Sequence, residues 1–173
     1  DIPAGKKFVM QPTPSNKVLI APYEAKQIYM VQYSNRGEKF NPEVEPIRSL
    51  YNEYFGGGMN SIVFQEMRES RGLAYSAWAG IVTGGKVIYP YTVQTQIATQ
   101  NDKMMDAIKT FNDIINNMPE SEAAFKLAKE GIISRLRTDR IIKDNILWSY
   151  IYAQDMGMNV DKRINCLLYT SDA

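Results

Sequence analysis

Two segments near the start of the chain have the hydrophobic pattern of β-strands. Lys17–Tyr23 is a short run of β-branched and apolar residues, and Gln27–Asn35 alternates between two faces. One face of the second segment carries Tyr29, Val31 and Tyr33, and the other face is also apolar. We therefore expect two strands here, the second of them covered on both faces.

A helical repeat follows the second strand and ends at a run of glycines. Asn41 is a good N-cap, and the proline after it fits the first helical position. Gly56–Gly58 stops the repeat, because glycine accepts the left-handed conformation in which helices end. Asn60 or Ser61 can then cap a short second helix that reaches residues 67–69.

The rest of the chain reads as two strands followed by three helices. Leu73–Thr83 and Lys86–Thr99 predict strands joined at Gly84–Gly85, which is a hairpin signal. Helices are expected over 101–118, over 121 to about 137, and from Asp144 to Gly157. The apolar side chains expected to face inward are Met104, Ile108, Phe111, Ile115 and Met118, then Phe125, Ala128, Ile132 and Leu136, and finally Ile146, Tyr150 and Ile151.

This order of elements predicts an α+β fold, with an antiparallel-rich mixed sheet and helices packed on one face. With 173 residues, 45% of them hydrophobic, the chain is long enough for one domain with a core. We expect a linker with a first strand over 1–16, and a single domain, truncated at its end, over 17–165. Residues 166–173, CLLYTSDA, resemble translated sequencing-adaptor read-through and are interpreted as a non-native tail.

Charge and composition exclude several classes of function. Twenty basic residues balance 19 acidic ones, so no global field would attract nucleic acid or an anionic membrane. No apolar stretch is long enough to span a bilayer, and the start DIPAGKK has neither an initiator Met nor an apolar signal region. We therefore expect a soluble fragment, and nothing in the sequence indicates its compartment.

The chain contains no histidine and a single cysteine, Cys166. The missing histidine excludes a Ser-His-Asp triad, a Cys-His pair and a histidine zinc site built from this chain alone. One cysteine allows no disulfide framework and no cysteine-rich metal site. No metal ligands and no cofactor are therefore predicted within the chain.

One stretch, Phe55–Gly80, combines a Gly-rich turn, a short helix ending in Met-Arg-Glu and a strand beginning Gly-Leu-Ala-Tyr-Ser. It resembles the C-terminal-type, non-zinc domain of the pitrilysin/insulinase family of zinc metallopeptidases, the inverzincins. The expected order of elements agrees with this family from Val18 to Gly157. Ile62 departs from the pattern, since family members often have an arginine there, which puts a local ion pair in doubt.

The resemblance implies a role for this chain in peptide hydrolysis. These enzymes consist of paired domains around a chamber, and the zinc site, His-x-x-Glu-His with a distant Glu, lies on the catalytic domain. The other domain lends an arginine and a tyrosine seven residues apart, which correspond here to Arg68 and Tyr75. The implied roles are substrate binding for Arg68 and Tyr75, and stabilisation of the oxyanion by Tyr75. The zinc ion would sit on a catalytic partner domain, in the same polypeptide or on another subunit, and the isolated chain would be inactive.

The same residues allow other interpretations of their roles and of the function of the chain. Without the resemblance, Arg68 is more often a surface arginine paired with Glu66 or Glu69, and Tyr75 a half-buried strand residue. The main alternative function is a catalytically silent structural or docking subunit of the same family. A weaker one is an RNA-binding sheet, which would need exposed aromatic residues on its strands and a basic rim. An extended peptide that adds a strand to an open sheet edge is the expected substrate geometry.

Overall fold

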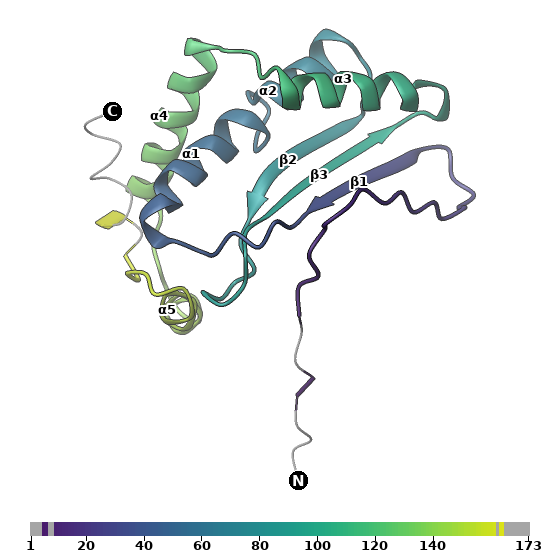
Figure 1. Ribbon diagram of the computed structural model, residues 1–173. Coiled ribbons are helices and arrows are strands. Elements are labelled where there is room, and N and C mark those ends of the chain that lie inside the picture. Colours follow the sequence, from purple (N-terminus) through teal and green to yellow (C-terminus); the bar gives the residue numbers. More distant parts are fainter. Residues whose placement is uncertain (1–4, 7–8, 162, 165–173) are drawn as a thin grey trace.

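A computed structural model describes residues 5–6, 9–161 and 163–164 of the chain (Figure 1). Its sheet consists of β1 (Ile28–Ser34), β2 (Ser76–Val82) and β3 (Thr92–Thr99) in the order β1-β3-β2. Both pairs of neighbouring strands are antiparallel, and β3 lies in the centre. The two strands that are adjacent in the sequence, β2 and β3, are therefore also adjacent in the sheet.

The helices cover one face of this sheet (Figure 1). Helix α1 contacts β2, and α3 contacts β3, whereas α4 packs on α1 as an outer layer. This arrangement confirms the predicted α+β class with helices packed on one face. The helical elements are η1 (Pro42–Val44), α1 (Glu45–Phe55), α2 (Ile62–Phe64), the π-helical η2 (Gln65–Ser70), η3 (Asn101–Lys103), α3 (Met104–Asn116), α4 (Glu122–Thr138) and α5 (Asn145–Asp155).

Polar side chains fix the start of several helices, as the sequence predicts. Asn41 accepts a hydrogen bond from the Glu43 amide at 3.0 Å, and Ser61 caps α2 by accepting one from Phe64. Each bond satisfies an amide that has no partner inside the helix. Asp144 stands at the N-cap of α5, but its side chain makes no capping bond there.

The core lies between the sheet and the helices α1, α2 and α3. It is formed by two alanines of β2 and by Ile97 of β3, with mostly larger side chains from the helices, and Met30 of β1 packs against it. The short alanine side chains of β2 let the helices approach the strand closely. The buried members are Phe55, Ile62, Val63, Met67, Ala74, Ala77, Ala79, Ile97, Ala107, Phe111 and Ile114.

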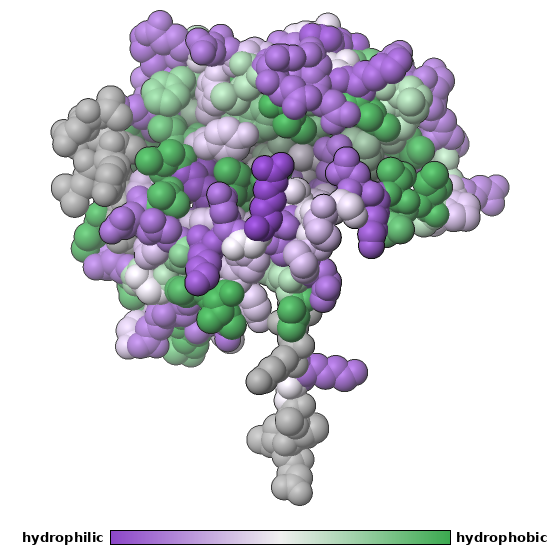
Figure 2. All heavy atoms as spheres, in the orientation of Figure 1, coloured by the Kyte–Doolittle hydropathy of each residue, from purple (hydrophilic) through white to green (hydrophobic). Residues whose placement is uncertain are grey.

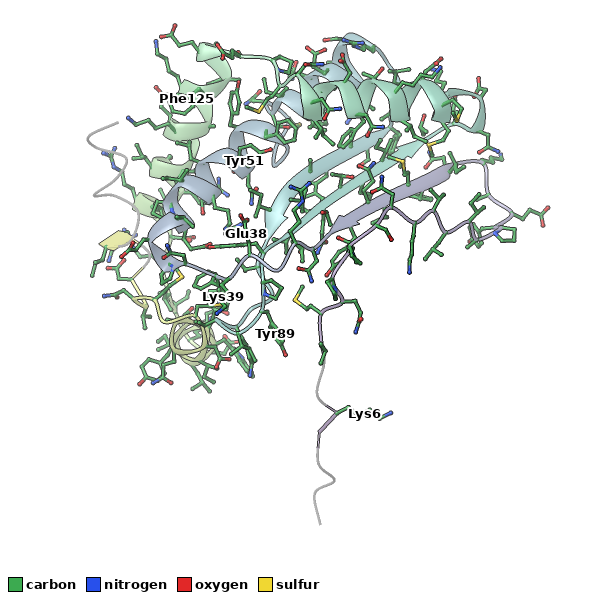
Figure 3. All side chains as sticks on the ribbon, viewed as in Figure 1. Lys6, Glu38, Lys39, Tyr51, Tyr89 and Phe125 are labelled. Carbon is green, nitrogen blue, oxygen red and sulfur yellow. The ribbon has the colours of Figure 1, made fainter. Side chains whose placement is uncertain are left out.

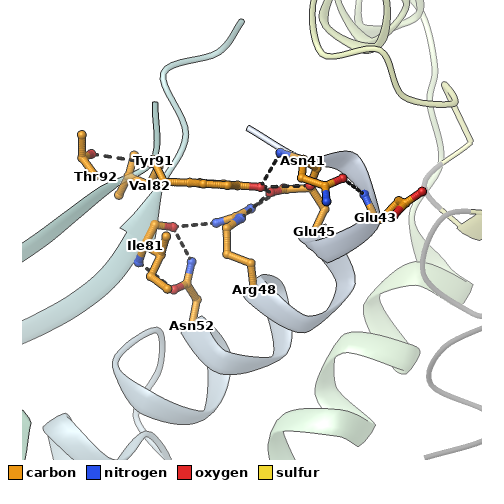
Figure 4. Close-up of polar contacts among 9 residues, drawn as sticks. All are labelled: Asn41, Glu43, Glu45, Arg48, Asn52, Ile81, Val82, Tyr91 and Thr92. Atoms are coloured by element: carbon orange, nitrogen blue, oxygen red, sulfur yellow. Dashed lines mark hydrogen bonds and ion pairs between the residues drawn. The ribbon is translucent and has the colours of Figure 1, made fainter. Parts of the chain in front are cut away.

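Side chains of α1 cover the free edge of β2 (Figure 4). The Ile81 amide donates to Asn52 Oδ1 at 2.8 Å, and the Ile81 carbonyl accepts from Asn52 Nδ2 at 2.9 Å and from Arg48 at 2.7 Å. Arg48 also forms a bidentate salt bridge with the buried Glu45, with both N–O distances 2.8 Å. Asn52 thus provides the donor and acceptor that a neighbouring strand would supply.

Two predictions about the strands are wrong, one of a first strand and one of a tight hairpin. Residues 17–23 form no strand in the structure, and their apolar side chains, Val18, Leu19 and Ile20 among them, are almost fully exposed. The Gly84–Gly85 pair does not form a tight hairpin, because β2 ends at Val82 and β3 begins only at Thr92. The loop 83–91 between them is held in part by α5, because the amide of Val87 donates to Asp155 O at 3.0 Å.

Several faces expected to be covered are exposed. Tyr29, Val31 and Tyr33 of β1 point to the side of the sheet that carries no helix, because the same strand turns Met30 toward the core. The prediction that both faces of this strand are covered is therefore wrong. Helix α5 exposes its three expected inward residues, and other apolar side chains of that helix with them. Figure 2 shows hydrophobic side chains reaching the surface near α5.

The prediction of which side chains of α3 and α4 face inward is partly correct. Met104 and Phe111 are buried, but Ala107 and Ile114 complete the face in place of Ile115. On α4, Ala128 and Ile132 are buried, whereas Phe125 is exposed in the first turn of the helix (Figure 3). Its ring meets that of Tyr54 edge-on, with 6.2 Å between the ring centroids. Met118, past the end of α3, is also exposed.

The expected non-native tail, 166–173, and Cys166 lie outside the described residues. Within the described part of the chain, no helix has both the length and the apolar character needed to cross a bilayer.

Candidate functional site

The predicted site residues lie on either side of the bend between η2 and β2. Arg68 is part of the π-helical turn 65–70, and Tyr75 immediately precedes β2. A π-helical turn holds one more residue than an α-helical turn and so shifts the direction of the side chains it carries. Gly72 stands between them with φ +57°, a left-handed conformation in which a glycine has no steric cost.

The bend is tied to the core through the backbone of Met67. The Met67 carbonyl accepts hydrogen bonds from the amides of Leu73 at 2.8 Å and Ala74 at 3.1 Å. The Met67 side chain is fully buried, and Ala74 is buried with it. The chain therefore turns back on a point that the core itself fixes.

Contacts with β3 and with Lys103 of η3 complete the support. The Tyr75 amide donates to Ala98 O at 2.8 Å, and the Thr99 hydroxyl donates to the carbonyl of Leu73. Lys103 donates from Nζ to Gly72 O at 3.1 Å. A bend held from both sides in this way presents its side chains in a fixed orientation, which preorganised binding requires.

This bend brings Arg68 and Tyr75 together on the surface. The guanidinium carbon of Arg68 lies 5.9 Å from the centroid of the Tyr75 ring and 5.0 Å from that of Phe64. Contacts of this length with ring faces are favourable cation–π interactions. Tyr75 is 69% exposed, and the Arg68 side chain 47% exposed, so both can reach a ligand.

Phe64 is a site residue that the sequence reading missed. It precedes Arg68 by four residues in the same helical stretch, which is the spacing that places two side chains on one helix face. That spacing was the available signal, but it is common in helices and carries no indication of function by itself.

Acidic neighbours balance part of the positive charge. Arg68 Nε lies 3.7 Å from Glu69 Oε1, and Arg71 pairs with Glu66 at 3.3 Å. Both pairs are largely solvent-exposed, so each contributes little to stability and can be rearranged by a ligand. Arg68 therefore forms the surface ion pair with Glu69 that is expected of an ordinary surface arginine, and it also contacts the Tyr75 ring.

The Tyr75 hydroxyl has no hydrogen-bond partner among the described residues. A free phenolic O–H can donate to an incoming oxygen atom, and an arginine presents several N–H groups in a fixed plane. The pair is chemically suited to hold carbonyl or carboxylate oxygens. Among the described residues, no three His, Cys, Asp or Glu side chains are grouped closely enough to hold a metal ion.

A separate groove of about 430 Å³ lies between α1, α4 and α5. Its walls include Arg48, Asn52, Ile132 and Tyr152, and it does not include Arg68 or Tyr75. The polar groups at its floor are engaged with each other or with Ile81, as described above. Glu45, Arg48 and Asn52 of the groove are therefore already used in contacts within the fold, and sequence patterns did not indicate the groove.

Comparison with known proteins identifies the family. The model of the peptidase M16 inactive domain matches residues 3–132 of the 173. The chain belongs to this family. The resemblance to the non-zinc domain of pitrilysin-type peptidases is thereby confirmed, and the chain is a non-catalytic domain of the kind found in M16 peptidases. No curated protein sequence matches it significantly.

Solved structures of similar fold come from three bacteria. A peptidase M16 inactive domain from Pseudomonas fluorescens aligns with a TM-score of 0.62 at 15% identity, over 87% of this chain and 35% of that one. The inactive peptidase domain of a candidate zinc protease from Bordetella parapertussis aligns at 0.58 and 11% identity, over 84% and 76%. A conserved protein from Enterococcus faecalis V583 aligns at 0.51 and 16%, over 80% and 32%. At these identities the alignments establish the shared fold, and this chain spans about a third of the first and third proteins.

Proposed function

We propose that this M16 inactive domain binds peptide substrate and completes the active site of a zinc-dependent metalloendopeptidase. The zinc ion would lie on a catalytic M16 domain, fused to this chain or on a separate subunit. In this proposal Tyr75 stabilises the oxyanion and Arg68 holds the substrate backbone. The observation that supports it most directly is the adjacency of the two exposed side chains across a rigid bend.

Peptide hydrolysis develops negative charge on the oxygen of the scissile carbonyl. A phenolic O–H that already points to the position of this oxygen stabilises the transition state without reorganisation. Arg68 would stand beside it and donate to a neighbouring carbonyl of an extended peptide, since its five N–H groups lie in one plane. A zinc ion on the catalytic domain would polarise the same carbonyl and activate water.

The geometry supports different roles for Arg68 and Tyr75. Arg68 is held by the Phe64 ring, by Tyr75 and by Glu69, so its guanidinium is placed before substrate arrives. The Tyr75 hydroxyl has no hydrogen-bond partner among the described residues and is available to a substrate oxygen. We therefore expect Arg68 to act mainly on binding and Tyr75 mainly on turnover.

The decisive experiment replaces Tyr75 by Phe in the peptidase that contains both domains. We expect kcat to fall by about a hundredfold or more, because one oxyanion donor is lost. Zinc content and the association of the two domains should stay unchanged, since the ring and its contact with Arg68 remain. Tyr29→Phe is the matched control, because it removes another exposed phenol from the same domain, on β1.

The same assay separates the proposal from its alternative. Unchanged kcat in Tyr75→Phe, with intact zinc and intact domain pairing, would assign the chain to a structural or docking role. Arg68→Lys should raise KM more than it lowers kcat, because the charge stays while the planar array of donors is lost.

A further inference from the structure

The edge of β1 opposite β3 is open for strand pairing. Asn35, just after β1, directs its amide and carbonyl away from β3 to Thr13. In an antiparallel ladder alternate residues face the same neighbour, so Tyr33, Val31 and Tyr29 also direct their amides and carbonyls to that side. These main-chain groups have no backbone partner in the described part of the chain.

The other edge of the sheet cannot accept a strand in the same way. The outward groups of Ile81 bind Asn52 and Arg48, and the backbone of Gly56 lies directly against that of Ala79. An added strand is therefore possible at β1 and not at this part of β2.

One residue pair already defines how a segment would lie on β1. The Thr13 amide donates to Asn35 O at 3.0 Å, and the Asn35 amide donates to Thr13 Oγ1 at 2.8 Å. Continued antiparallel pairing from this point places Ser15 opposite Tyr33, Lys17 opposite Val31 and Leu19 opposite Tyr29. The intervening residues, 20–27, are enough to close the connection to β1.

We propose that the edge of β1 is a strand-binding site and that residues 13–19 occupy it, as a fourth strand in this register. In the described structure only the Thr13–Asn35 pair has formed, and residues 14–19 make no backbone hydrogen bonds to β1. The proposal concerns a second state, in which the remaining pairs close. It is independent of the role proposed for Arg68 and Tyr75.

The positions of proline fit this register. Residues 13, 15, 17 and 19 must donate their amides to β1, and none of them is proline. Pro12, Pro14 and Pro22 all fall on the alternate positions, whose amides would face away from β1. Prolines on the outer edge would also prevent any further strand from adding.

The side chains fit it as well. Even-numbered residues of the segment would stand on the same face as Met30, which packs against the core. Val18 would lie beside Met30, whereas its side chain is 86% exposed in the open arrangement. Closure would remove this apolar surface from water, which is a favourable change.

Closure has a consequence for binding. Extended peptides that join a sheet use the main-chain groups of its edge strand. Residues 13–19 would compete for the same groups of Tyr29, Val31 and Tyr33, so the segment controls access to this edge.

Hydrogen exchange of the 173-residue chain tests the proposal. We expect the amides of Tyr29, Val31 and Tyr33 to be protected, and Lys17→Pro to speed their exchange by at least about tenfold, because it removes one of the pairing amides. Asn16→Pro is the matched control, since its amide would face away from β1, and it should leave the protection unchanged.

A cross-link gives a second measurement of the register. With Cys166→Ser as background, the pair Asn16→Cys and Gln32→Cys should form a disulfide on mild oxidation, because these residues would be directly opposite. The pair Lys17→Cys and Gln32→Cys should not, because a shift of one residue places the two side chains on opposite faces.

Three results would overturn the proposal. One is exchange at the three amides that is as fast in the parent chain as in Lys17→Pro. Another is equal cross-linking of both cysteine pairs. The third is protection that rises with protein concentration, which would assign the edge to pairing between two copies of the chain.

Discussion

At the scale of single residues, two glycines have different roles within one motif. Gly72 supplies a backbone conformation, because its φ of +57° lies in the left-handed region. Gly56 supplies space, because the end of α1 lies against the backbone of Ala79 in β2. The sequence shows both glycines, and in the case of Gly56 it suggests only a helix end.

Gly56→Ala should destabilise the fold. A methyl group at this position would lie 2.2 Å from Ala79 O, and the neighbouring atom is backbone that cannot rotate away. We expect a loss of about 2–3 kcal/mol in the free energy of unfolding, measured by urea denaturation. Gly58→Ala is the control, since its methyl group would meet only the Glu53 side chain, at 3.6 Å, and it should change stability far less.

Gly72→Ala should also destabilise, but through backbone strain alone. No atom lies within 4 Å of the added methyl group, so there is no packing clash. A left-handed alanine costs about 1–2 kcal/mol, and Gly72→Asn should cost less, because asparagine tolerates this conformation better. Equal stability of the Ala variant and the parent in urea denaturation would mean that the bend relaxes without cost.

At the scale of elements, the attachment of α1 to β2 depends on polar contacts as well as on the core. Helix α1 positions Asn52 and Arg48 so that both bind the main chain of Ile81 (Figure 4). These contacts cover an edge that is otherwise open to association with other chains. Sequence patterns located the helix and the strand, but they gave no sign of this contact between them.

Asn52→Ala should therefore weaken the joint between α1 and β2. The partly buried Ile81 amide would lose its acceptor, and leaving such a donor unpaired costs up to about 1–3 kcal/mol. Asn52→Asp should cost less, because it keeps an acceptor for that amide. Asn112→Ala, at an exposed position of α3, is the control and should change the urea midpoint little. A similar small effect of Asn52→Ala would show that water replaces the lost contact.

At the scale of the whole molecule, two tyrosines link stability to alkaline pH. Burial raises the pKa of Tyr51. Burial is also the largest cause of the raised pKa of Tyr91, and the nearby Glu45 carboxylate raises that pKa further. Above the ordinary tyrosine pKa of about 10, the unfolded chain loses these protons while the folded chain keeps them. The unfolded state is then favoured as the pH rises, so stability falls.

We expect the free energy of unfolding to be insensitive to these two groups below about pH 9, and to decline from about pH 10 upward through the raised folded pKa values. Tyr91→Phe should be less stable than the parent near neutral pH, because the contacts of its hydroxyl with Asn41 and Glu45 are lost. Its stability should also decline less steeply with pH. A parallel decline in both proteins, measured by urea denaturation across the series, would contradict the assignment to Tyr91.

Much of the fold could be predicted because the signals are local. Asn41 and Ser61 mark helix starts through bonds to amides two or three residues away, and glycine marks the bend before Tyr75 through its own φ. The family resemblance rests on the same short stretch. Burial was predicted less well, since several hydrophobic residues of α5 and of the outer face of β1 are exposed in the described part of the chain.

The amino-acid sequence by itself determined the order of the helices and of the strands from residue 27 onward, the capped helix starts and the bend at Gly72. Each of these depends on interactions over a few residues. Only the tertiary structure decided that Phe64 supports Arg68 beside Tyr75, that Gly56 and Asn52 cover the edge of β2, and that the outward main-chain groups of Tyr29, Val31 and Tyr33 lie on a free edge in the described structure. Those contacts join residues from different elements, and their distances depend on how the elements pack in three dimensions.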